Sequence, residues 1–139
     1  MKSKRIGNIC FIRIDKGEEI ISSLKKFCEN ENIKLGKISG IGATNNVTVG
    51  LFEPSKQQYH SNTLKEDFEI LSLTGNITTM KNEVYLHCHI TLANKNHQSF
   101  GGHLNSAVVS ATCEIVLEVY DGSVDRFFDQ ESGLNLLDI

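Results

Sequence analysis

The sequence has 139 residues, of which 40% are hydrophobic and 22% are charged, and its net charge is −3 at neutral pH. These proportions exclude wholesale disorder, and the acidic balance disfavours a general surface for polyanions. No apolar stretch approaches the ~20 residues that span a bilayer, so we expect one soluble cytoplasmic domain over residues 1–139, with no membrane partner. Four widely spaced cysteines in apolar contexts are typical of reduced core side chains.

The first half of the chain predicts strands around one helix. Residues Arg5–Asp15 are rich in β-branched and aromatic side chains, which predicts a strand. An amphipathic helix is expected over about Glu18–Asn30, because glutamates suit its first turn and apolar residues recur at helical spacing. Three glycines within Lys34–Ala43 indicate a strand with a bulge or a close backbone approach. A turn at Asn45–Asn46 and a strand over Val47–Phe52 should follow.

The second half predicts further strands and a docked tail. Lys56–His60 reads as a short strand, followed by a polar loop over Ser61–Lys65. A strand is expected over Phe68–Thr79, with apolar residues on both faces at its start, so that both faces should be partly buried there. A long strand is expected over Ser110–Tyr120. The tail Val124–Ile139 carries too many large apolar side chains to remain free in solvent, so it should pack on the body.

The segment Glu83–Leu104 carries the clearest chemical signal. Its first ten residues alternate between apolar and polar, which predicts a half-buried strand. His87 and His89 fall together on the polar face of this strand. His103 follows the pair Gly101–Gly102, which we expect to bend sharply and to carry a third imidazole toward the other two.

Three imidazoles in this arrangement predict a site for one divalent metal ion on His87, His89 and His103. Zinc is favoured because it prefers imidazole nitrogens, whereas nickel, copper and iron remain alternatives. Three protein ligands leave a fourth position for water or a substrate, and a metal-bound water is a nucleophile near neutral pH. His60 and His97 lie in polar stretches and are expected to face solvent.

The predicted elements add up to an α+β fold, a mainly antiparallel β-sheet of about six to seven strands with one packed amphipathic helix. Three charged residues lie within its apolar strands: Arg13, Glu69 and Glu114. The favoured interpretation is that each glutamate forms a structural ion pair with Arg13, Arg126 or a lysine, within the chain or across a subunit interface. The alternative is that a glutamate supports a ligand histidine or acts as a general base beside the metal.

Several motifs occur in an order that spans nearly the whole chain. They are Arg13 with Gly17-Glu18, Gly40-x-Gly42-Ala43, Phe68-Glu69-Ile70, Leu73-x-Gly75-Asn76, His87-x-His89, Gly101-Gly102-His103-Leu104, Thr112-x-Glu114-Ile115-Val116, Arg126-Phe127-Phe128-Asp129 and Ser132-Gly133-Leu134. In these motifs the sequence resembles the PPC (plants and prokaryotes conserved) domain, also called DUF296, in its prokaryotic single-domain form. The resemblance implies a mainly antiparallel sheet with packed helices, assembly into homotrimers, and metal binding, commonly of zinc, by the H-x-H and G-G-H histidines.

Three classes of function follow. The first is a metal-binding homotrimer that recognises a protein or a small molecule. The second is DNA binding or transcriptional regulation, the usual label of the family, which is disfavoured because the chain is acidic and contains no Arg-Gly-Arg-Pro of the AT-hook that plant members carry. The third is a metal-dependent hydrolase, so whether the protein is an enzyme stays open at this point.

Overall fold

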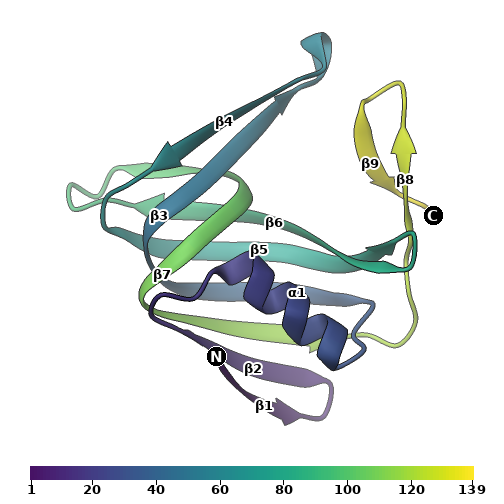
Figure 1. The fold of residues 1–139 in the computed structure, drawn as a ribbon, viewed down its shortest axis with the longest axis horizontal. Coiled ribbons are helices and arrows are strands. Elements are labelled where there is room, and N and C mark those ends of the chain that lie inside the picture. Colours follow the sequence, from purple (N-terminus) through teal and green to yellow (C-terminus); the bar gives the residue numbers. More distant parts are fainter.

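A computed structural model describes residues 1–139 as a seven-stranded antiparallel sheet with one long helix packed on it (Figure 1). The strand order is β1-β2-β7-β6-β5-β3-β4, and a second sheet contains only β8 and β9. This confirms the predicted α+β class. Neither helix is long and apolar enough to cross a membrane. The elements are β1 (Lys2–Ile6), β2 (Ile9–Asp15), α1 (Ile20–Asn30), β3 (Gly36–Glu53), the 3-10 helix η1 (Pro54–Lys56), β4 (Gln58–Leu64), β5 (Phe68–Met80), β6 (Glu83–Ala93), β7 (Ser99–Val119), β8 (Arg126–Asp129) and β9 (Leu134–Leu137).

Two long strands close the sheet on itself. β7 has 21 residues and pairs with β2, with β6 and also with β3, which has 18 residues. Since β3 pairs with β5 and β5 with β6, four strands form a closed circuit of hydrogen bonds. The register shifts where β3 meets β7, and Figure 1 shows β7 bending in its middle. Such bulges increase local twist, which lets one strand serve several partners.

The helix and one sheet face enclose a core of 23 buried apolar residues. Ile20, Leu24, Phe27 and Cys28 line the buried side of α1, at the spacing that the sequence predicts. The four cysteines are free and buried. Burial raises the pKa of Cys28, Cys88 and Cys113 to about 12, so these thiols stay protonated and pack as apolar groups.

The structure corrects three local predictions. The strand expected over Arg5–Asp15 is a hairpin, β1 and β2, which turns at Gly7 with a φ of 62°. The turn expected at Asn45–Asn46 is absent because β3 runs through it and Asn46 pairs with Val108 of β7. The polar loop expected over Ser61–Lys65 lies mostly in β4, paired with β3. In the last two cases a partner distant in sequence decides the structure, which local polarity does not reveal.

A carboxylate fixes the start of α1. Glu19 is the N-cap, and its side chain accepts hydrogen bonds from the backbone N–H groups of Ile21 at 3.0 Å and Ser22 at 2.7 Å. It also accepts one from the N–H of Ala107 in β7 at 2.9 Å. One side chain therefore caps the helix and ties it to the longest strand.

We predict that Glu19→Ala lowers the free energy of unfolding by about 1–3 kcal/mol, because three backbone N–H groups lose their acceptor. Urea denaturation followed by circular dichroism measures this change. Glu29→Ala is the matched control, since Glu29 is an exposed glutamate of the same helix whose only ion pair, to Lys25, spans 3.9 Å. Equal stability of the two variants would contradict the role of the cap.

Candidate metal centre

The three histidines singled out by the sequence converge in the structure. His87 and His89 stand on β6, and His103 on β7 lies opposite His89 in the β6–β7 ladder. The ring centroids are 5.2 Å apart for His87 and His89, 5.2 Å for His87 and His103, and 5.6 Å for His89 and His103. One ring nitrogen of each lies within 4.8 Å of the others. His60 and His97 are exposed elsewhere, as expected.

The glycine pair before His103 has a different role from the expected one. Gly101 and Gly102 are not a bend between elements but lie inside β7. A Cβ on Gly101 would lie 2.4 Å from the backbone oxygen of Ile90, and one on Gly102 would lie 2.7 Å from the backbone oxygen of Gly50. The glycines are therefore needed because neighbouring strands approach closely on both sides of the segment that holds His103.

The histidines line a pocket of about 980 Å³ between two hairpins. One wall comes from the β3–β4 hairpin and the other from the β8–β9 hairpin. Figure 1 shows both hairpins projecting from the same side of the molecule. The hairpins meet where the Gln57 Nε2 donates to the backbone oxygen of Glu131 at 2.9 Å. The tail docks as expected, as the β8–β9 hairpin that forms one wall of the pocket, but the hairpin's large apolar side chains stay 38–58% exposed in the single chain. No aspartate or glutamate lines this pocket.

The surroundings lower the pKa of two of the imidazoles, those of His87 and His103. Burial is the main cause that lowers the pKa of His87 to about 4, and the positive charges of His103, Arg126 and His89 add to it. Burial also lowers the pKa of His103, with His89 contributing. A neutral imidazole keeps one nitrogen lone pair, and this is the form that binds a metal ion. The donor set, three imidazoles without carboxylate or thiolate, fits zinc and its neighbours among transition metals.

Arg126 also lines this pocket, and it makes no ion pair with Glu69 or Glu114, the partners for which the sequence made it a candidate. It begins β8, is buried, and its guanidinium lies 4.9 Å from the centre of the Tyr85 ring. The available signal was a lone arginine in a tail that is expected to pack on the body, although Phe127 and Phe128 beside it stay 46% and 58% exposed.

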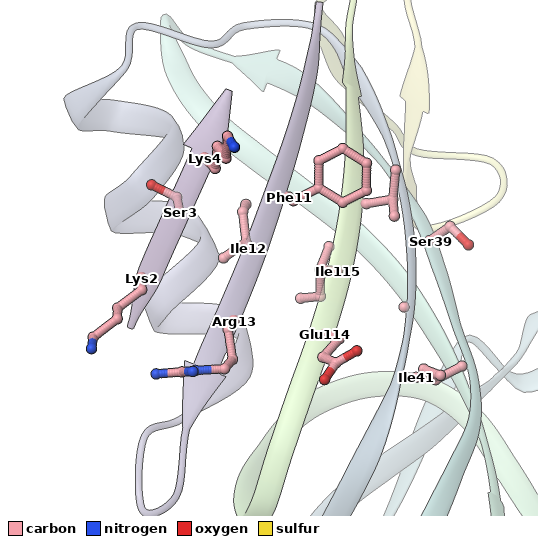
Figure 2. Close-up of a pocket in the computed structure, with 12 residues that line it drawn as sticks. Lys2, Ser3, Lys4, Phe11, Ile12, Arg13, Ser39, Ile41, Glu114 and Ile115 are labelled. Carbon is pink, nitrogen blue, oxygen red and sulfur yellow. The ribbon is translucent and has the colours of Figure 1, made fainter. Parts of the chain in front are cut away.

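The residues expected to form ion pairs lie elsewhere. Arg13, Glu69 and Glu114 are exposed, and none lines the histidine pocket. The Arg13 Nε donates to Asp15 Oδ1 at 2.9 Å, whereas the two glutamates make no salt bridge within the chain. Figure 2 shows Arg13 and Glu114 on neighbouring strands in a separate groove, with their charged ends pointing apart. Within one chain, neither glutamate supports a ligand histidine.

Comparison with known proteins gives consistent results. Residues 1–121 match the Plants and Prokaryotes Conserved domain. The structure is similar to a protein of Bacteroides thetaiotaomicron provisionally assigned to DNA binding, with a TM-score of 0.97, 38% identity, and coverage of 99% of this chain and 96% of that one. It is also similar to a metal-containing protein of Archaeoglobus fulgidus, with a TM-score of 0.87, 32% identity, and coverage of 96% and 94%. A plant- and prokaryote-conserved (PPC) protein of Pyrococcus horikoshii gives a TM-score of 0.87 at 32% identity, with coverage of 99% and 94%.

One curated relative is much longer than this chain. Over 108 residues, or 76% of the chain, the sequence is 28% identical to the bifunctional protein GlmU of Synechococcus sp. (strain JA-2-3B'a(2-13)). The chain spans only 16% of the length of that protein. The similarity therefore concerns a small part of the longer protein.

We predict that Gly101→Ala displaces His103 and lowers the free energy of unfolding by about 1–3 kcal/mol, because the added methyl group overlaps the oxygen of Ile90. Chemical denaturation of the metal-free protein measures the stability, and the imidazole NMR signals report the displacement. Ser99→Ala, at an exposed position of the same strand, is the control and should change neither. Unchanged histidine signals in Gly101→Ala would contradict the close-approach explanation.

Proposed function

We propose that this chain, which belongs to the Plants and Prokaryotes Conserved (PPC) domain family, binds one divalent metal ion through His87, His89 and His103. Zinc is the first candidate for this ion. The observation that carries the proposal is the convergence of three ring nitrogens within 4.8 Å of one another. Zinc–nitrogen bonds are ~2.0–2.1 Å long, so small side-chain rotations bring all three nitrogens to one ion. The Archaeoglobus neighbour, named as metal-containing, supports this reading.

The role that best fits the pocket is binding or regulation. A metal on three imidazoles has room for one further ligand, and the pocket offers space for a small molecule or a segment of a protein. Hydrolysis by a metal-bound water is the alternative, but no carboxylate in the walls is placed to act as its general base. Assays with ester, phosphoester and amide substrates, with and without chelator, separate the two.

DNA binding is the second candidate function. The neighbour from Bacteroides thetaiotaomicron, provisionally assigned to DNA binding, favours it. The net charge of −3 and the three scattered arginines disfavour it for this chain acting alone, because phosphate contacts supply most of the affinity of non-specific binding. Binding to a duplex that weakens steeply with salt would support this candidate over the first.

We also propose that the protein assembles into a homotrimer. Its outer sheet face exposes a row of large apolar side chains that a single chain leaves uncovered, and Figure 2 shows part of it. The exposed fractions are 48% for Phe11, 59% for Ile41, 51% for Leu71 and 37% for Val116. Glu69 and Glu114 lie beside this row without charged partners, so an interface here would give them the ion pairs that the sequence predicts.

The cytoplasm is the compartment that we propose. The four cysteines are free and buried in the core. Free thiols of this kind are typical of reducing compartments.

We predict that purified protein retains about one zinc ion per chain and that His103→Ala weakens zinc binding by more than about 100-fold, since loss of a supporting residue alone typically weakens binding 10–100-fold. Elemental analysis and competition with a chromogenic chelator measure this. The control is His60→Ala, which removes an exposed histidine outside the pocket. Equal zinc affinity of His103→Ala and the wild type would refute the site.

We predict that light scattering gives one mass near three chains over a wide concentration range, and that Ile41→Asp dissociates the assembly. A buried charge at an interface is unfavourable, whereas at this exposed position it should leave the single chain folded. Ile139→Asp, at a terminal residue that is 98% exposed, is the control. A stable, folded wild-type monomer would overturn the trimer.

A further inference from the structure

Arg126 is a buried cation with no anionic partner in the chain. Only 7% of it is exposed. Its Nε donates to Thr78 Oγ1 at 2.8 Å and its Nη1 to the backbone oxygen of Asn135 at 2.8 Å. Its Nη2 donates to Asn76 Oδ1 at 2.9 Å. All three acceptors are neutral, and two of the five N–H groups of the guanidinium remain free.

These contacts hold the guanidinium in place but do not neutralise it. The Tyr85 ring covers one of its faces, a favourable but modest interaction. A charged group removed from water is strongly unfavourable unless an opposite charge accompanies it. Three neutral hydrogen bonds hold this positive charge in place, and no residue of the chain neutralises it. We therefore expect the neutralising anion to come from outside the chain.

The free charge lies beside the histidines. Asn76, which accepts the bond from Arg126, is the neighbour of His87 across the β5–β6 ladder. Arg126 and the three histidines line the same pocket, and no aspartate or glutamate does. A divalent ion on neutral imidazoles adds a charge of +2 to the +1 of Arg126. The occupied pocket would then carry +3 without any carboxylate of its own.

We propose that this pocket binds a small organic oxyanion, a carboxylate or a phosphate monoester, whose charged end lies between Arg126 and the histidine-bound metal. This inference rests on the proposed metal function. Arginine matches carboxylate and phosphate oxygens in geometry as well as in charge. The apolar body of the ligand contacts the two hairpins, which supply the side chains of Leu51, Phe52, Phe128, Leu134 and Leu136. A volume of about 980 Å³ accommodates such a molecule.

The test uses three probes of similar shape on the zinc-loaded, full-length protein: benzoate, phenyl phosphate and the neutral benzamide. Isothermal titration calorimetry measures the affinities, and the visible spectrum of the cobalt(II)-loaded protein reports a new ligand at the metal. We expect at least one anion to bind at least about tenfold more tightly than benzamide, because charge-assisted hydrogen bonds are roughly twice as strong as neutral ones. Whichever of benzoate and phenyl phosphate binds with the higher affinity shows whether the site prefers a carboxylate or a phosphate monoester.

Arg126→Gln removes the charge but keeps hydrogen-bonding capacity, and should weaken binding of the preferred anion at least about tenfold. Arg13→Gln is the matched control, because Arg13 lies outside the pocket and should leave the affinity unchanged. Circular dichroism checks that both variants fold. If Arg126→Gln does not fold, the comparison of anions with benzamide on the wild type still decides the question.

Metal content is measured on every sample, so that the two proposals fail separately. Bound zinc together with equal affinities for anions and benzamide overturns the oxyanion site and leaves the metal centre standing. If zinc-loaded Arg126→Gln binds the anion as tightly as the zinc-loaded wild type does, the oxyanion site is likewise overturned and the metal centre stands. Absence of bound metal overturns both.

Discussion

The pairing of β7 with both β6 and β3 is the constraint on which the rest of the structure depends. It closes the circuit of four strands and sets His103 opposite His89. It also brings the strands so close together that no Cβ fits at Gly101 or Gly102. The backbone spacing, more than any side-chain contact, therefore fixes the distance between the histidines.

The C-terminal hairpin completes the site through one residue. Arg126 joins β8 to β5 by its bonds to Thr78 and Asn76, and to β9 by its bond to Asn135. The same side chain brings a positive charge next to His87 and contributes to its low pKa. A single arginine thus holds the β8–β9 hairpin in position and adds positive charge to the pocket that the hairpin borders. The tail is part of the site although it lies beyond residues 1–121 that match the family.

Sequence reasoning succeeded where a pattern is local. The alternation from Val84 to Leu92 predicts which face of β6 is buried, and it places His87 and His89 on the other face. The spacing of apolar residues likewise predicts the buried side of α1. Both patterns depend only on the periodicity of one element, which is why they can be read without knowing any partner strand.

Sequence reasoning failed where a strand distant in the sequence decides the local structure. Asn46 remains in a strand because Val108 pairs with it, and β4 exists because β3 offers an edge to its polar residues. At the start of β5 the register shifts between Ile70 and Ser72, so Leu71 is exposed and the expected two-sided burial does not occur. Neither the bulge nor the long-range pairing leaves a local signature in the sequence.

The outer apolar face and the histidine pocket share strands but no side chains. β3, β5 and β7 contribute to both, yet no residue of the outer face lines the histidine pocket. On β7, Glu114 and Val116 belong to the outer groove, whereas Gly102 and His103 belong to the pocket, and the bend of the strand lies between them (Figure 1). A substitution on the outer face can therefore change the proposed assembly without altering the three histidines of the pocket. The proposed assembly and the proposed ligand binding are separable by experiment, and the strands that the two surfaces share offer a route for any coupling between them.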